Sequence, residues 1–81
     1  MLRILIADDE YLAIEAVKKI IKNNIEDANI VATASSGKEA IIKVNELSPD
    51  IAIMDIQMPG IDGLEAIRQI KASNPNILFI V

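Results

Sequence analysis

The chain contains four short runs of almost uninterrupted apolar residues. They lie at residues 2–7, 29–34, 51–54 and 77–81. Runs of this length favour β-strands that are covered on both faces, which is typical of parallel sheets. The run at 29–34 is more polar than the others, so we expect it at an edge of the sheet.

Between these runs the apolar residues recur at helical spacing. Helices are predicted at about 11–23, 36–47 and 62–73, with the segment SNPN ending the third. The residues expected to face inward are Ala13, Ala16, Val17, Ile20 and Ile21 in the first helix, Ala40, Ile41, Val44 and Leu47 in the second, and Leu64, Ile67 and Ile70 in the third.

Two of the predicted helices begin with a capping-box spacing. Ser36 and Glu39 are three positions apart, as are Asp62 and Glu65. In such a box the first side chain accepts a hydrogen bond from the helix start, and the acid reaches back. Pro49 is expected to end the second helix.

The strands and helices therefore alternate, beginning and ending with a strand. This order indicates an α/β domain with a parallel sheet and right-handed crossovers. The length of 81 residues allows one domain at most. In a parallel sheet all strands end at the same edge, where ligands bind.

Acidic residues end two of the apolar runs. Asp8 and Asp9 follow the first strand, and Asp55 follows the third. If these strands are neighbours, the three carboxylates converge and repel one another unless a cation lies between them. Mg²⁺ prefers carboxylate, carbonyl and water oxygens, so the pattern predicts a magnesium site.

Each of these signals alone has an ordinary structural interpretation. Asp8, Asp9 and Glu10 could cap the first helix, and Asp55 could begin a turn. The dipeptides PG and DG that follow Asp55 are common turn signals. The conjunction of an acid pair, a single acid and a proline-glycine loop favours the metal site. Met54 and Met58 are expected to be packing residues.

The composition excludes several classes of chemistry. The chain has no cysteine and no histidine, which excludes disulfides, the usual zinc site and any mechanism that needs those side chains. Its net charge of −4 argues against binding to nucleic acid or to an anionic membrane. With no membrane-length apolar run and no signal-peptide pattern at its start, the chain is expected to be cytoplasmic.

The motifs resemble the receiver domain of two-component response regulators. The matching segments are ILIADDE at 4–10, SGKEAI at 36–41 and PDIAIMDIQMPGIDGLEAIRQIK at 49–71. The resemblance runs from the first residues to the last and implies a flavodoxin-like, doubly wound sheet of order 2-1-3-4. It also implies transfer of a phosphoryl group from a sensor histidine kinase to an aspartate, in a signalling module rather than an enzyme.

The resemblance assigns roles to particular residues. Asp55 matches the phosphoacceptor, Asp9 the direct Mg²⁺ ligand, and Asp8 an acid that helps to hold the metal through water. The backbone carbonyl of Gln57 matches a third protein ligand. Pro59 and Gly63 match the residues that shape the loop, and the role of Glu10 stays open.

The chain also departs from the family pattern. Residues 1–81 would be the N-terminal two thirds of a receiver domain, without the fifth strand, the hydroxyl residue after the fourth strand and the lysine after the fifth. We therefore expect weak or no phosphorylation and no normal switch. The uncharged strand at 77–81 would be an edge, so a homodimer or exchanged oligomer through this strand, or a partner that supplies the missing half, is expected.

Three other functions are possible from the residues alone. The chain could be a self-associating structural fragment with a relic acid pocket. A flavodoxin-like mononucleotide binder would need hydroxyls and glycines after the first strand, where this chain has aspartates. An aspartyl-phosphate phosphatase would carry its nucleophile after the first strand instead of the third. Many receivers precede a DNA-binding output domain that regulates transcription, but no residue of this chain reads DNA.

Overall fold

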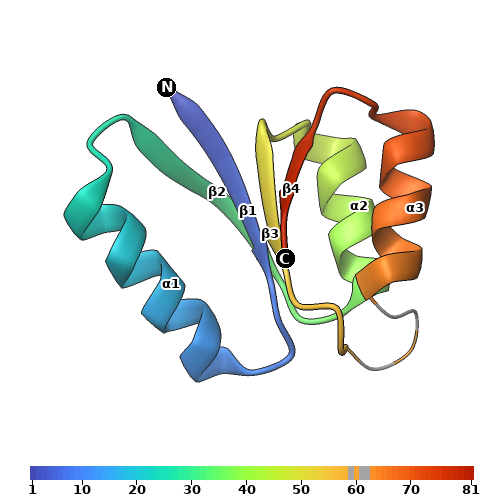
Figure 1. Cartoon of the computed structure of the whole chain (residues 1–81), viewed down its shortest axis with the longest axis horizontal. Helices are drawn as coiled ribbons and strands as arrows, with labels where there is room; N and C mark the ends of the chain where they lie inside the picture. Colours follow the sequence, from blue (N-terminus) through green and yellow to red (C-terminus); the bar gives the residue numbers. More distant parts are fainter. Residues whose placement is uncertain (59, 61–62) are drawn as a thin grey trace.

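The computed structural model describes residues 1–58, 60 and 63–81. Strands and helices alternate along the chain as the sequence predicts (Figure 1). The elements are β1 (Leu2–Ala7), α1 (Tyr11–Asn24), β2 (Ala28–Ala34), α2 (Gly37–Leu47), β3 (Ile51–Met54), α3 (Gly63–Ser73) and β4 (Leu78–Ile80).

The four strands form one parallel sheet of order β2-β1-β3-β4. The flavodoxin-like fold class and the strand order are thereby confirmed, and β2 is an edge strand as expected. Ile4 lies opposite Ile51 in the register between β1 and β3, and Ala7 lies opposite Met54. The two central strands therefore end side by side.

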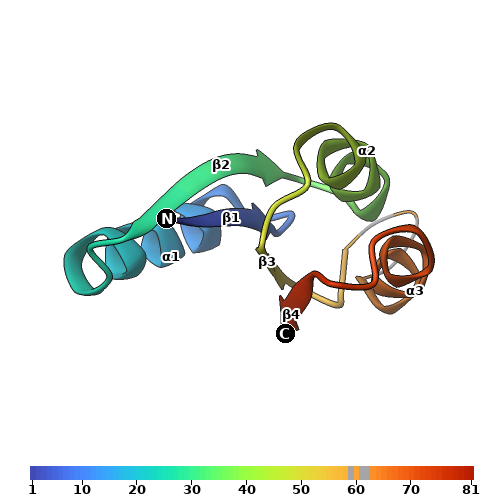
Figure 2. The same ribbon diagram turned by 90° about the horizontal axis from the view of Figure 1, so that it is seen from above.

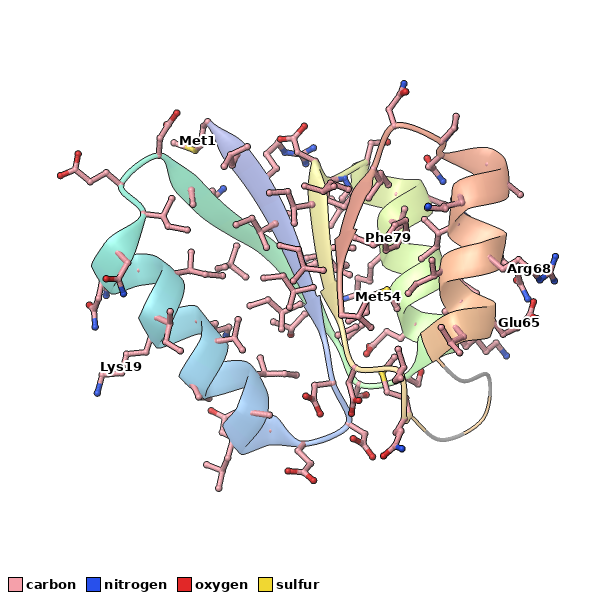
Figure 3. All side chains as sticks on the ribbon, viewed as in Figure 1. Met1, Lys19, Met54, Glu65, Arg68 and Phe79 are labelled. Atoms are coloured by element: carbon pink, nitrogen blue, oxygen red, sulfur yellow. The ribbon has the colours of Figure 1, made fainter. Side chains whose placement is uncertain are left out.

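Helices cover the two faces of the sheet unequally. The helix α1 lies on one face, over β1 and β2, and α2 and α3 lie on the other (Figure 2). The larger buried cluster packs between the sheet and α2 and α3, with Leu5, Val44, Met54 and Ile70 at its centre. Met54 and Phe79 point into this layer (Figure 3).

The predicted inward face of α1 is wrong in part. Ile14 and Ile21 are buried under this helix, together with the partly buried Val17. Ile20 is 62% exposed, and Ala16 is exposed as well. Because α1 packs over β1 and β2 and not over β3 and β4, the part of its apolar stripe that contains Ile20 has no packing partner among the described residues.

Leu64 also departs from its predicted orientation. It is 62% exposed, while Ala66 and Ile70 are buried and Ile67 packs against the core. Gly63 contacts the backbone after β3 and thereby sets the rotation of the first turn of α3. This rotation directs the neighbouring Leu64 toward solvent.

The predicted capping box of α2 is present. The hydroxyl of Ser36 accepts a hydrogen bond from the amide of Glu39 at 3.1 Å. The Glu39 carboxylate reaches back to the amide of Ser35, one residue earlier than the usual box, at 2.6 Å. The helix ends at Leu47, and its C-cap residue Ser48 has the left-handed conformation before Pro49. Asp62, predicted to cap α3, lies outside the described residues.

Among the residues described, no helix combines the length and apolarity that crossing a bilayer requires.

Candidate metal centre

The carboxyl ends of β1 and β3 place three aspartates at one rim of the sheet. Asp8 and Asp9 directly follow β1, and Asp55 directly follows β3. One carboxylate oxygen of each residue lies within 4.8 Å of one from each of the others. The structure thus brings together the three acids singled out in the sequence, because neighbouring parallel strands end at the same edge.

Backbone hydrogen bonds extend the sheet as far as these acids. The amide of Asp55 donates to the carbonyl of Ala7 at 2.9 Å, which ties the end of β3 to β1. The amide of Asp8 donates to the carbonyl of Ala34 at 3.0 Å, which ties the end of β1 to β2. Two of the three acids are therefore positioned by the sheet itself.

Local turns orient two of the carboxylates. Asp8 Oδ1 accepts a hydrogen bond from the amide of Glu10 at 2.9 Å, and Asp55 Oδ1 accepts one from the amide of Gln57 at 3.0 Å. These are the turn contacts that aspartates commonly make. Asp55 therefore begins a turn, as its structural interpretation predicts. Capping of α1 by Asp8, Asp9 or Glu10 is wrong, because the N-cap residue Glu10 makes no side-chain capping hydrogen bond and Asp8 instead accepts from the amide of Glu10.

The rim carries the negative charge of three aspartates. Asp8 and Asp55 are partly buried and Asp9 is exposed. Within the described part of the chain, no lysine or arginine forms a salt bridge with any of them. Three carboxylates in such proximity repel one another, so the arrangement favours a bound cation.

The loop after Asp55 is held from two sides. The amide of Gly63 donates to the carbonyl of Ile56 at 3.0 Å, and Met58 is buried in the core. A Cβ on residue 63 would lie 2.3 Å from the Ile56 Cα, closer than any real contact. Only glycine allows α3 to begin so close to the acid site. Pro59, also predicted to shape this loop, lies outside the described residues.

Lys43 was not anticipated at this end of the sheet. A cavity of about 290 Å³ beside Asp8 and Asp9 is lined by this lysine, whose Nζ donates to the Thr33 carbonyl at 3.4 Å. The lysine is on α2, within the helix predicted at 36–47. Its place in the sequence could have indicated this location, because the first turns of α2 follow the end of β2 and lie near the same rim.

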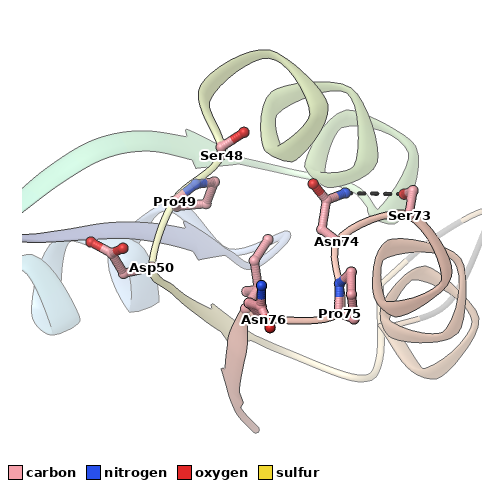
Figure 4. Close-up of a pocket in the computed structure, with 8 residues that line it drawn as sticks. Ser48, Pro49, Asp50, Ser73, Asn74, Pro75 and Asn76 are labelled. Carbon is pink, nitrogen blue, oxygen red and sulfur yellow. Dashed lines mark hydrogen bonds between the residues drawn. The ribbon is translucent and has the colours of Figure 1, made fainter.

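A second cavity, of about 340 Å³, lies at the opposite end of the sheet. It is formed by the C-terminal ends of α2 and α3 and by Asp50, which precedes β3 (Figure 4). Asn74 there donates to Ser73 and to Asn45. This cavity is separated from the acid rim by the length of β3, so it is not part of the candidate site.

Comparisons with known proteins agree with this fold. The model of the response regulator receiver domain family matches residues 4–81. The chain is 43% identical over 81 residues to the chemotaxis protein CheY of Listeria monocytogenes, covering all of this chain and 66% of CheY. It is 40% identical over 80 residues to the response regulator GacA of Pseudomonas viridiflava, covering 99% of this chain and 37% of GacA.

Solved structures give the same result. The response regulator domain of Thermotoga maritima CheB superposes with a TM-score of 0.89 at 35% identity, covering 98% of this chain and 59% of that one. The CheX-CheY-BeF3-Mg+2 complex from Borrelia burgdorferi gives a TM-score of 0.90 at 31% identity, covering 96% and 58%.

The fold is thus that of a two-component signalling module, and the chain belongs to the response regulator receiver domain family. It spans less than two thirds of the length of the relatives compared above.

Proposed function

We propose that Asp55 of this chain accepts a phosphoryl group from a sensor histidine kinase at a site that binds Mg²⁺. The observation that carries this proposal is the convergence of Asp8, Asp9 and Asp55 within 4.8 Å at the ends of two paired strands. The similar CheY from Borrelia burgdorferi, solved with BeF3 and Mg+2, supports it by analogy.

The acid cluster fits the chemistry of magnesium. Its donors are hard carboxylate oxygens, and two ligands on opposite sides of an octahedral Mg²⁺ stand about 4.2 Å apart. Separations of up to 4.8 Å allow Asp9 and Asp55 to bind directly after a small adjustment, with Asp8 acting through water. The Gln57 carbonyl would supply a further oxygen. When bound, the cation neutralises the charge of the cluster and of the incoming phosphoryl oxygens.

The chain itself supplies a positioned nucleophile. The amide of Gln57 holds one oxygen of Asp55, which leaves the other oxygen to attack phosphorus. A new O–P bond forms as the P–N bond of the phosphohistidine breaks, and the electron pair of that bond stays on the imidazole nitrogen. A carboxylate is ionised at neutral pH, so no general base is required.

Exposed apolar residues around the acid rim support a protein as the donor. Tyr11 and Leu12 open α1, Ile56 follows Asp55, and Leu64 lies in the first turn of α3, all with large exposed fractions. Exposed apolar groups around a polar centre are typical of protein-interaction surfaces. We infer that the kinase domain docks on these residues.

The experiment that tests this function is phosphorylation of the purified chain. The chain is incubated with Mg²⁺ and a small acyl phosphate, and the intact protein is weighed. We expect a fraction of the chains to gain one phosphoryl group that maps to Asp55 and that is lost in Asp55→Asn or when Mg²⁺ is chelated. A gain that persists in Asp55→Asn would contradict the proposal.

We further propose that the 81-residue polypeptide alone is phosphorylated weakly and lacks a normal switch. No described basic side chain pairs with the acid cluster, and Lys43 is engaged with a carbonyl of β2. A basic side chain near the phosphoryl group, in addition to Mg²⁺, usually stabilises the transition state of phosphoryl transfer. The phosphorylation rate of the 81-residue chain is therefore expected to be lower than that of the Listeria CheY under the same conditions.

A second candidate role is self-association through β4. Leu78 and Ile80 are 60% and 47% exposed, on the face they share with the partly buried Ile51 and Ile53. In the described part of the chain no helix covers this half of the face (Figure 2). We propose a homodimer or exchanged oligomer that covers this surface through β4. If calorimetry shows no Mg²⁺ binding, a structural role with a relic acid pocket becomes the better account.

We infer that residues 1–81 correspond to about the N-terminal two thirds of a receiver domain, which the 59% coverage of the CheB domain supports. A signalling role in the cytoplasm, without enzymatic turnover of its own, follows from the proposed phosphoryl transfer. Transcription regulation would require a separate output domain, because the net charge of −4 does not favour DNA contact.

A further inference from the structure

A groove between α1 and β2 lies at the end of the sheet opposite the acid rim. Its cavity has a volume of about 370 Å³ and is formed by the last turns of α1 and the first residues of β2. Its apolar floor consists of the buried Ile21, the partly buried Ala28 and Ile30, and the exposed Ile25. A volume in this range holds a few side chains of a ligand.

Lysines stand along one side of this groove. Lys18 and Lys22 both line it and are four residues apart, so they lie on the same side of α1. Lys18 forms an exposed ion pair with Glu15 at 3.2 Å, whereas Lys22 forms no ion pair within the described residues. Glu26 also lines the groove, after the end of α1, and gives that end the opposite charge.

The groove borders the one stretch of β2 that is not protected against strand addition. No charged residue or proline occurs in β2. A register shift between Ile30 and Ala32 interrupts its regular edge, and farther along Lys43 donates to the Thr33 carbonyl. The register shift and the lysine hydrogen bond both discourage pairing of this part of β2 with another strand. The regular segment 28–30 precedes them and lines the groove.

We propose that this groove binds an extended segment of a protein partner that carries an apolar residue followed two positions later by an acid. The segment adds to β2 along 28–30, with main-chain hydrogen bonds to the free edge. Alternate side chains of a strand point the same way, so the apolar residue enters the floor while the carboxylate reaches Lys18 and Lys22. Glu26 disfavours the reverse orientation.

Two blocked pentapeptides test this proposal against the full 81-residue chain. One has the sequence threonine-isoleucine-threonine-glutamate-threonine, and the control carries lysine in place of glutamate. Binding is followed by NMR through backbone amide shifts. We expect the acidic peptide to shift residues 22 and 28–30 and to bind about fivefold more tightly than the basic one, as an exposed ion pair allows.

Two charge-reversal variants on α1 distinguish peptide binding in the groove from a general effect of net charge. Lys22→Glu is expected to weaken the acidic peptide about fivefold and to favour the basic one. Lys19→Glu makes the same charge change outside the groove lining and should leave both affinities nearly unchanged. The proposal is overturned if the two variants behave alike, if neither peptide binds, or if the shifts centre on β4.

Discussion

Gly63 approaches Asp55 so closely that a Cβ on residue 63 would lie 2.4 Å from the carbonyl oxygen of Asp55. The first residue of α3 is therefore in contact with the residue proposed to accept phosphate. Because the Gly63 amide also donates to Ile56, the helix and the end of β3 are joined at one point. This contact makes the geometry of the acid rim depend on a position that has no side chain.

Gly63→Ala is expected to lower the free energy of unfolding by about 1–3 kcal/mol, as overpacking of a close contact does. It should also weaken Mg²⁺ binding, because Asp55 moves when α3 is displaced. Urea unfolding and calorimetric titration measure the two effects. The neighbouring Leu64→Ala serves as the control and should change stability by less than about 0.5 kcal/mol, since Leu64 is exposed. Equal effects of the two changes would refute the proposed contact.

Asp9→Asn is expected to change stability in opposite directions with and without magnesium. Without divalent cations it should raise the free energy of unfolding by up to about 1 kcal/mol, because one repulsion between carboxylates is removed. With Mg²⁺ at 100 times its dissociation constant the unchanged protein should gain about 2.7 kcal/mol, and the variant should gain much less.

Thermal unfolding at fixed ionic strength measures this reversal. Glu46→Gln removes one negative charge from an exposed position on α2 and provides the control for net charge. If Mg²⁺ stabilises Asp9→Asn as much as it stabilises the unchanged chain, the cation binds elsewhere.

Ile80→Lys is expected to abolish self-association through β4. A lysine in an edge strand discourages pairing, and here it also places a charge on the uncovered apolar face. Light scattering across a concentration series should show an oligomer for the unchanged chain and a monomer for this variant. Leu64→Lys adds the same charge at an exposed position outside the sheet and should leave the oligomer intact. A monomer for the unchanged chain at high concentration would exclude this interface.

Arg68→Gln is expected to raise the pKa of Glu65 toward its ordinary value. The hydrogen bond from the Arg68 side chain, with help from Gln69, holds the pKa of Glu65 below its usual range on the outer side of α3 (Figure 3). A carboxyl whose pKa is lowered by folding stabilises the folded state above its unfolded pKa, and this contribution disappears as the pH falls.

The pair lies on the surface, with Arg68 exposed and Glu65 partly exposed, so its effect on stability should be small and should weaken with salt. Carbon-13 NMR of the Glu65 carboxyl against pH measures the pKa directly. An unchanged pKa in Arg68→Gln would show that Arg68 is not the main cause.

The sequence predicted the fold and the acid rim because both depend on features that act locally. Short apolar runs define the strands, and the parallel arrangement then places Asp8, Asp9 and Asp55 together without any knowledge of loop details. The exposure of Ile20 and Leu64 was not predictable in this way, since it depends on which strands α1 covers and on how closely Gly63 packs. The cavity that Lys43 lines depends on three elements at once, and helical spacing alone does not reveal it.

The central claim is that Asp9 and Asp55 share one magnesium ion, and a crystal structure of the chain grown with Mg²⁺ tests it most directly. We expect a single octahedral ion with carboxylate oxygens of both residues about 2.1 Å away, and with the Gln57 carbonyl among its ligands. Density for the ion at another place, or ordered Asp9 and Asp55 side chains with no shared ion at saturating Mg²⁺, would contradict the account.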